Sequence, residues 1–181
     1  MLLVLTIVTG VIYPLLMTAI AQLFFSHKAN GSLVEKDGKV IGSELIAQSF
    51  QSDKYFWPRP SAINYIPLPS GASNYGPTSD TLRNLVINRK RDFIQKNNLL
   101  PETIVPNEML FASGSGLDPH ISPDAALMQV NRIAHARSLD NQRKAALSNL
   151  VRNQIEGPQF GLFGEPRVNV FKLNFALDDL K

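Results

Sequence analysis

Apolar residues fill the first 25 positions almost without interruption, and beyond them they recur at spacings typical of helices and strands. Residues 1–25 read MLLVLTIVTGVIYPLLMTAIAQLFF and carry no charged side chain. A helix of this length rises about 1.5 Å per residue and spans roughly 37 Å, which is enough to cross the hydrocarbon core of a bilayer. We therefore predict a transmembrane helix over residues 1–26 and one globular domain over residues 27–181.

A cleaved signal peptide is the alternative for this first segment. The apolar run is longer than that of a signal peptide, no basic residue precedes it, and no Ala-x-Ala site follows it. These features favour a retained anchor. Its orientation does not follow from charge, because a long domain largely escapes the positive-inside rule. Pro14 lacks an amide proton, so we expect a kink and an unpaired carbonyl near residue 10.

Small or polar residues recur every four positions along this helix. The stripe consists of Thr6, Gly10, Pro14, Thr18 and Gln22. Lipid gives membrane helices little hydrophobic drive to associate, so association depends on small residues that let two backbones approach closely. We interpret the stripe as a face that docks against another membrane helix. The alternative is that these residue types are common in membrane helices of any kind.

The polar remainder of the chain predicts short strands, capped helices and one long irregular segment. Asp37-Gly38 lies between two β-prone runs and predicts a hairpin, and residues 43–50 predict a short helix capped by Ser43. Five prolines keep residues 51–77 out of regular structure. Apolar residues at helical spacing predict three helices, preceded by the capping residues Ser79, Ser122 and Asp140.

Apolar alternation over residues 167–177 (RVNVFKLNFAL) predicts the clearest strand of the chain. Together these elements predict an α+β fold, in which one N-terminal transmembrane helix precedes a single soluble domain with a small sheet and about three helices.

Composition excludes several classes of protein. The chain has 181 residues, of which 44% are hydrophobic, a net charge of +3 and no cysteine. This aliphatic content excludes intrinsic disorder, and a single apolar stretch excludes a polytopic carrier. The small net charge gives no support to nucleic-acid binding. Without cysteine there is neither a disulfide framework nor thiolate chemistry.

Catalytic and metal-binding motifs are missing from the sequence. There is no P-loop and no paired-histidine spacing, so we predict no catalytic residues, no metal site and no cofactor of the chain's own. The run Ser113, Gly114, Ser115, Gly116 could cradle an anion on its backbone N–H groups. The alternative is a glycine-rich turn that lets two elements lie close together.

An extracytoplasmic hydrolase or ligand-binding domain stays open as an alternative function. A hydrolase would use Ser115, His120 and Asp118, three residues of one loop, whereas catalytic triads are usually assembled from separate elements. We assign Arg59, Asp118 and His120 structural or partner-facing roles instead. Arg59 is wedged between two prolines that fix its direction, and Asp118 precedes a proline. A direct Arg59–Asp118 pair is a hypothesis; if it is buried, loss of one partner should cost about 3–5 kcal/mol.

Several blocks of sequence together resemble the C subunit of the Kdp potassium-transporting P-type ATPase, a bacterial membrane complex. They are GVIYP (residues 10–14), ANGS (29–32), GSELIAQSF (42–50), YFWPRPSA (55–62), SGASNYGP (70–77), ASGSGLDPHISPDAALMQ (112–129) and GEPRVNVFKLNFAL (164–177). They follow the family's order over nearly the whole chain. The combination of YF-x-PRPSA with SGSGLDPHISP is the most specific part of the resemblance.

This resemblance implies a single-pass subunit of the bacterial inner membrane with its domain outside the cytoplasm. It implies three partners: a channel-like potassium-binding subunit, a P-type ATP-hydrolysing subunit and a small membrane peptide. The subunit would stabilise the complex without a catalytic site of its own. It would also act as a catalytic chaperone that raises the ATP affinity of the hydrolysing subunit. A subunit that binds ATP directly, shared with the hydrolysing subunit, is a separate hypothesis, and it would use Gln48 and residues 113–116. A domain outside the membrane does not meet cytosolic ATP, and no nucleotide motif is present, so both routes stay open.

Overall fold

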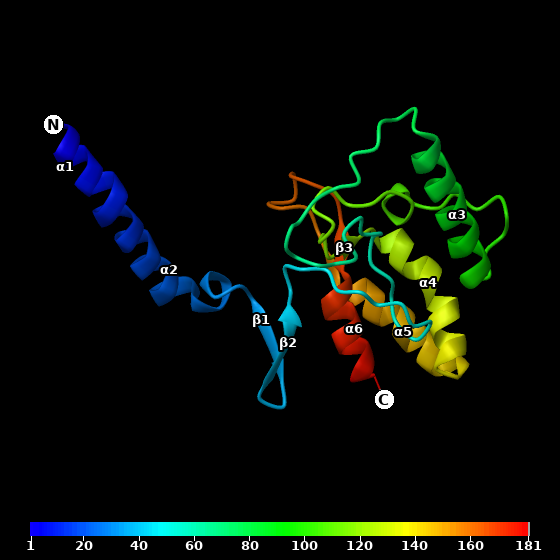
Figure 1. Cartoon of the computed structure of the whole chain (residues 1–181). Coiled ribbons are helices and arrows are strands. Elements are labelled where there is room, and N and C mark those ends of the chain that lie inside the picture. Colours follow the sequence, from blue (N-terminus) through cyan, green and yellow to red (C-terminus); the bar gives the residue numbers. More distant parts are fainter. Residues whose placement is uncertain (181) are drawn as a thin grey trace. The chain divides into compact units, whose positions relative to one another are not determined.

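The computed structural model describes residues 1–180, which form two compact units. The first unit is Met1–Leu45, and the second begins at Ile46. The first consists of a long helix and a hairpin, and the second contains four α-helices and a small sheet (Figure 1). The α+β class predicted from the sequence is confirmed.

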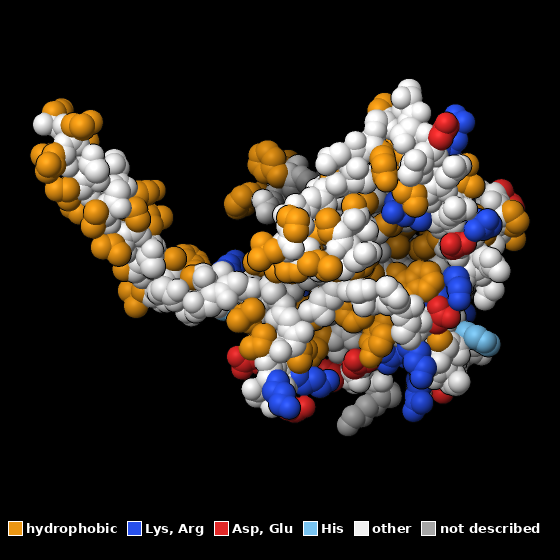
Figure 2. Space-filling view, viewed as in Figure 1, with side chains coloured by type: hydrophobic (Ala, Val, Ile, Leu, Met, Phe, Trp, Pro, Cys, Tyr) orange, Lys and Arg blue, Asp and Glu red, His pale blue; other side chains and the backbone are white. Residues whose placement is uncertain are grey.

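The first unit begins with a continuous helical segment from Leu2 to Ala29. It is divided into α1 (Leu2–Ile7), the π-helical turn η1 (Val8–Ile12) and α2 (Tyr13–Ala29). The segment has a mean hydropathy of 2.2 and is long and apolar enough to cross a membrane. Exposed apolar side chains are spread along its whole length, and no charged side chain is visible among them until its C-terminal end (Figure 2).

Just before Pro14, where the sequence predicts a kink and an unpaired carbonyl, the helix takes a π turn. In the π turn the Tyr13 N–H donates to the Val8 carbonyl, five residues back. Pro14 has no N–H to offer the Gly10 carbonyl, and a π turn is a common way for a helix to absorb such a break. A second departure lies at Phe25, whose φ of −136° and ψ of 35° are not helical.

The predicted hairpin is confirmed, whereas the predicted short helix after it is wrong. β1 (Leu33–Lys36) pairs antiparallel with β2 (Lys39–Ser43) across Asp37-Gly38, where both residues have positive φ. Residues 44–50 form turns and coil. The Ser43 hydroxyl, expected to cap a helix, instead donates to the Gly31 carbonyl at 2.7 Å, and the Ala47 N–H donates to the Leu117 carbonyl at 2.9 Å. These contacts outweigh the weak local preference for helix.

The second unit contains the helices α3 (Asp80–Lys96), α4 (Pro123–Ala136), α5 (Asn141–Asn153) and α6 (Val170–Asp178). A 3₁₀ turn, η2 (Asn107–Met109), follows α3. Its antiparallel sheet has the order β3-β5-β4, formed by His120–Ile121, Arg167–Asn169 and Ile155–Glu156.

The helix caps predicted at Ser79, Ser122 and Asp140 are confirmed. The side chains of Ser79, Ser122 and Asp140 each accept a hydrogen bond from the backbone N–H three residues later. Such caps satisfy amide groups that have no partner within the helix. The starts of α3, α4 and α5 are therefore set by local sequence.

The strand predicted over residues 167–177 is wrong beyond Asn169. β5 ends there, and the Asn169 side chain caps α6 by accepting the Lys172 N–H at 3.1 Å. The buried residues of α6 are Val170, Phe171, Leu173, Asn174 and Leu177. The apolar positions thus satisfy helical spacing as well as alternation, and the asparagine cap decides between them.

A single core joins the helices of the second unit to its irregular segment. Fully buried side chains include Ile133 of α4, Leu147 of α5, Val168 of β5 and Leu173 of α6. Phe56 lies among them with no exposed surface, although residues 44–79 contain no helix or strand. The predicted irregular segment is confirmed, and polar side chains described below hold it in place.

Candidate functional site

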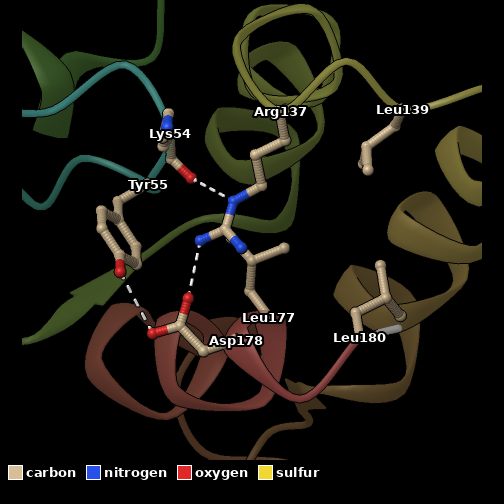
Figure 3. Close-up of a pocket in the computed structure, with 7 residues that line it drawn as sticks. All are labelled: Lys54, Tyr55, Arg137, Leu139, Leu177, Asp178 and Leu180. Carbon is tan, nitrogen blue, oxygen red and sulfur yellow. Dashed lines mark hydrogen bonds and ion pairs between the residues drawn. The ribbon is translucent and has the colours of Figure 1, made fainter.

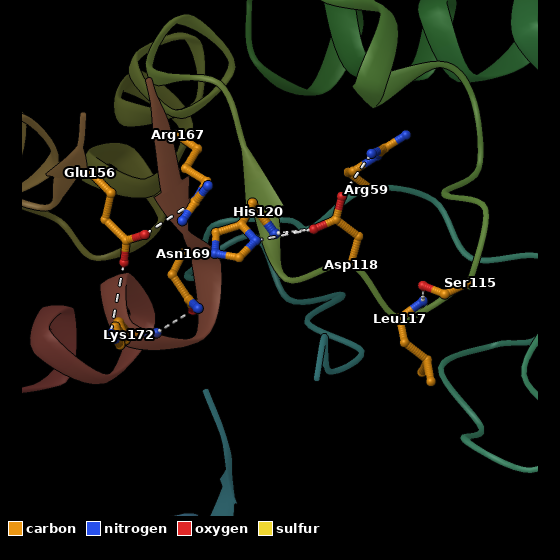
Figure 4. Close-up of polar contacts among 9 residues, drawn as sticks. All are labelled: Arg59, Ser115, Leu117, Asp118, His120, Glu156, Arg167, Asn169 and Lys172. Carbon is orange, nitrogen blue, oxygen red and sulfur yellow. Dashed lines mark hydrogen bonds and ion pairs between the residues drawn. The ribbon is translucent and has the colours of Figure 1, made fainter. Parts of the chain in front are cut away.

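The predicted pair of Arg59 and Asp118 is present in the second unit. Arg59 Nη1 donates to Asp118 Oδ2 at 2.7 Å. The other carboxylate oxygen accepts the His120 N–H at 3.0 Å and lies 3.2 Å from His120 Nδ1 (Figure 4). The Arg59 and Asp118 side chains are 25% and 32% exposed, so the pair is half-buried and should contribute less than a fully buried one.

Tyr65 fixes the backbone that presents this arginine. Its hydroxyl donates to the Arg59 carbonyl at 2.8 Å. Burial raises the pKa of Tyr65 to about 12, against the opposing effect of the nearby Arg89 guanidinium. Arg59 Nε is itself buried and has no hydrogen-bond partner within the described residues. Within the described residues, the guanidinium of Arg59 therefore binds Asp118 through Nη1 and not through Nε.

We expect Asp118→Asn to lower stability at neutral pH and to lose this effect in strong acid. Burial raises the pKa of Asp118, but hydrogen bonds from His120 and Arg59 outweigh it and lower the pKa from 3.8 to about 2. A lowered carboxyl pKa stabilises the fold above the unfolded value, and this stabilisation disappears as pH falls through the folded value. Allowing for partial exposure, we expect about 1–2 kcal/mol near pH 7. Urea titrations near pH 7, 4 and 2 measure it; a difference that persists unchanged at pH 2 would contradict this assignment.

The glycine-rich run at residues 113–116 is hydrogen-bonded to neighbouring loops. The Ser113 N–H donates to the Pro60 carbonyl at 3.2 Å, and the Ser115 carbonyl accepts the Gly71 N–H at 3.1 Å. The Gly116 N–H donates to the Ser113 carbonyl at 3.1 Å. Ala47 joins the same region through its bond to Leu117, which brings the neighbouring Gln48 toward the run. The residues expected to contact ATP thus lie on connected loops.

Ser115 and His120 do not form a nucleophile–base pair in the described residues. The Ser115 hydroxyl accepts the Leu117 N–H at 3.1 Å, whereas the His120 ring turns to Asp118 (Figure 4). A serine nucleophile requires its base within hydrogen-bond reach, although apo geometry can be looser. This arrangement gives the hydrolase alternative no support.

A buried polar network that the sequence analysis missed holds the irregular segment against α4 and α6. Asn174 accepts the Phe56 N–H at 2.8 Å and donates to the Phe56 carbonyl at 2.9 Å. Gln129 does the same for Trp57, at 2.7 and 3.3 Å. Each carboxamide thus satisfies both the N–H and the carbonyl of one residue, as a residue of a neighbouring strand would. The coil at residues 55–57 is stabilised in this way without a sheet.

Arg132 of α4 completes this network. Its guanidinium donates to the Asn97 side chain at 3.0 Å and to the carbonyls of Asp53 and Tyr55 at 2.7 and 3.0 Å. It also lies 3.8 Å from the centre of the Trp57 ring. Burial lowers the pKa of Arg132 to about 10, and Asp53 partly opposes that shift. Gln129 and Arg132 lie three positions apart on the otherwise apolar face of α4. Two polar residues at such positions were the signal in the sequence that could have indicated a buried network.

Arg137, the residue directly after α4, borders an open pocket of about 340 Å³. Arg137 donates to the Lys54 carbonyl and to Asp178, each at 2.8 Å, and the Tyr55 hydroxyl donates to the other oxygen of Asp178 at 3.1 Å (Figure 3). Leucines line the rest of the pocket, among them Leu139. Its polar groups are occupied by bonds within the chain, which indicates a role in closing the fold.

In the first unit, the predicted docking stripe lies on an exposed helix. The hydroxyls of Thr6 and Thr18 donate to carbonyls four residues back, at 3.0 and 2.8 Å. Gln22 donates to the Asn30 side chain at 3.1 Å. A side chain built at Gly10 would meet no described atom within 4 Å, so the backbone is bare there. The polar groups of the stripe are satisfied within the chain, which leaves its small residues available for close helix contact.

The architecture defines an α+β domain joined to one apolar N-terminal helix long enough to span a membrane. A family model described as "K+-transporting ATPase, c chain" (KdpC) matches residues 1–179. The chain is 48% identical over 178 residues to a potassium-transporting ATPase KdpC subunit from Leptospira interrogans, covering 98% of this chain and 90% of the relative. A KdpC subunit from Methylococcus capsulatus is 50% identical over 186 residues, covering 100% and 95%. The chain belongs to the KdpC family.

Proposed function

We propose that this chain is a non-catalytic subunit that assembles and stabilises a potassium-transporting ATPase complex in the bacterial inner membrane. The observation that carries this proposal is the family match, which extends from the apolar helix to the end of α6. The partners would be the three subunits expected from the sequence. The second unit would lie outside the cytoplasm. Potassium movement and ATP hydrolysis would belong to the partners.

The chemistry of the second unit supports a structural role. Its buried polar side chains, Arg132, Gln129 and Asn174, bind the chain's own backbone rather than lining a cavity. The half-buried Asp118 is tied to Arg59 and His120. A catalytic acid or base normally needs a polar atom that can hydrogen-bond to the substrate. These residues therefore suit a rigid domain that presents a surface to partners.

The helix stripe gives the proposal its first test. Gly10→Leu should reduce co-purification of this chain with its partner subunits by about tenfold or more, equivalent to about 1.4 kcal/mol of contact energy. A Cβ at Gly10 would meet no described atom within 4 Å, so we expect the effect of the substitution to arise at the contact with another helix. Val11→Leu changes an exposed neighbour outside the stripe and serves as the control.

Thermal unfolding of the second unit should be the same in both variants, because both substitutions lie in the first unit. Tagged chain expressed with its partners and recovered in mild detergent provides the measurement. Equal recovery of partners with Gly10→Leu and Val11→Leu would contradict the docking function of the stripe.

The chaperone role extends this proposal to ATP affinity. A subunit bound to the complex can raise the ATP affinity of a partner through the conformation it stabilises, without touching the nucleotide. Direct contact through Gln48 and residues 113–116 is the alternative. Three backbone N–H groups of that region, those of Ser113, Gly116 and Leu117, are already bonded within the chain, which favours the indirect route.

Two measurements separate these routes. The apparent ATP affinity of the complex should fall when this chain is removed. Labelled ATP should show no saturable binding to this chain alone at millimolar concentration. Saturable binding that Ser115→Ala abolishes would support direct contact and overturn the indirect route.

A further inference from the structure

The segment between β4 and β5 presents three large apolar side chains to solvent. Phe160, Leu162 and Phe163 are 92%, 81% and 67% exposed, although they lie within four consecutive residues. No charged residue occurs from Gly157 to Gly164. In Figure 1 this orange segment projects away from the helices of the second unit. Such a concentration of apolar surface exposed to water marks a site of interaction with another protein or with a membrane.

Four backbone N–H groups at this tip are hydrogen-bonded within the turn. The Gln159 N–H donates to the Phe163 carbonyl at 2.8 Å, and the Phe163 N–H returns to the Gln159 carbonyl at 3.0 Å. The N–H groups of Gly161 and Leu162 are bonded within the same turn, each at 3.1 Å. Unpaired backbone groups are what chiefly prevents irregular chain from entering hydrocarbon. The bonded N–H groups therefore lower the cost of placing this turn at the boundary between lipid headgroups and acyl chains, where its remaining polar groups can still meet water.

The first unit keeps the chain close to the end of its apolar helix. The Ser32 N–H donates to the His27 carbonyl at 2.9 Å, and the Glu44 N–H donates to the Ser32 carbonyl at 3.1 Å. The hairpin thus brings Glu44 back beside Ser32, which lies three residues after the end of the helix at Ala29. The second unit begins two residues after Glu44, at Ile46. A short covalent connection of this kind raises the effective concentration of whatever it tethers.

We propose that Phe160, Leu162 and Phe163 insert into the lipid bilayer that the chain's own helix crosses. The inference rests on the membrane anchorage proposed above. Three side chains of this size offer about 500 Å² of apolar surface, less than the roughly 800 Å² per partner of a stable protein interface. A patch of this area suits shallow insertion beside an existing anchor better than an independent dimer. The insertion would add a second attachment to the membrane.

Fluorescence quenching in lipid nanodiscs tests the insertion. The chain has no cysteine, so Leu162→Cys provides a unique attachment point for an environment-sensitive fluorophore. Ile104→Cys is the matched control, because Ile104 is 86% exposed and lies outside the turn. The full chain is placed in nanodiscs of phosphatidylcholine and phosphatidylglycerol, whose two faces are both open to solvent. Nitroxide on the lipid acyl chains should quench the label at 162 several-fold more than the label at 104, and iodide several-fold less.

Each other outcome overturns the proposal in a distinguishable way. Equal iodide quenching at both sites would mean that the turn stays in water. Protection at 162 from both quenchers would mean contact with protein, such as a second copy. If the chain does not elute with the nanodiscs, the anchorage itself is wrong. Phe160→Ser combined with Phe163→Ser in the labelled chain should remove the lipid quenching without changing the melting temperature.

Discussion

Arg132→Ala should lower the free energy of unfolding by about 3–5 kcal/mol, the largest effect we expect in the second unit. Arg132 is 4% exposed, and its removal leaves the Asn97 side chain and the carbonyls of Asp53 and Tyr55 without their donors. A buried acceptor that loses its partner costs about 1–3 kcal/mol. This applies in full to the Asn97 side chain and in part to the two carbonyls, whose bonds are part-buried. Loss of the cation over the Trp57 ring adds to this.

Urea unfolding followed by far-ultraviolet circular dichroism measures this change independently of tryptophan fluorescence. Arg152→Ala is the control, because Arg152 is exposed on α5, and its effect should stay within about 0.5 kcal/mol. Arg132→Lys should lose most of the stability too, since an ammonium cannot reproduce the planar set of donors. If Arg132→Ala unfolds at the urea concentration of Arg152→Ala, the network does not hold the irregular segment.

Gly116→Ala should be the second most damaging change, at about 2–4 kcal/mol. Gly116 has a φ of +72°, and a Cβ there would lie 2.5 Å from Ile63 Cγ1 and 3.0 Å from the Gly71 carbonyl oxygen. A left-handed conformation costs an L-residue roughly 1–2 kcal/mol, and overpacking typically adds about 1–3 kcal/mol. The glycine thus permits three loops to approach one another.

Gly114→Ala provides the matched control, because a Cβ at Gly114 would meet no described atom within 4 Å. Melting temperatures of the two variants compare them directly. Shortening Ile63 to alanine in the Gly116→Ala protein should recover part of the loss, because it removes the nearest atoms. Equal stability of the two glycine variants would contradict a structural role for Gly116. It would then favour the alternative that residues 113–116 bind an anion.

Local sequence signals were sufficient for the features that depend on a few neighbouring residues. The caps at Ser79, Ser122 and Asp140 and the Asp37-Gly38 turn are of this kind, because each acts within about four residues. The Arg59–Asp118 pair was also foreseen, since the prolines beside each residue restrict its direction.

Features that depend on distant partners were not predictable in the same way. The bonds of Asn174 and Gln129 to residues 56 and 57 join positions 118 and 72 apart in sequence. Residues 170–177 were mistaken for strand because their apolar positions fit both periods. The cap that decides for helix is the bond from the Lys172 N–H to the Asn169 side chain. The membrane stripe and the ATP-contacting residues depend on partners outside this chain and stay predictions.

Protease protection in oriented membranes tests most directly whether this chain is an anchored subunit with its second unit outside the cytoplasm. In right-side-out vesicles, added trypsin should digest the second unit, where lysines and arginines are exposed on α3 and α5. In inverted vesicles the same unit should resist trypsin until detergent is added. The opposite pattern would place the unit in the cytoplasm, within reach of ATP, and recovery of the intact chain from the soluble fraction would contradict the anchor itself.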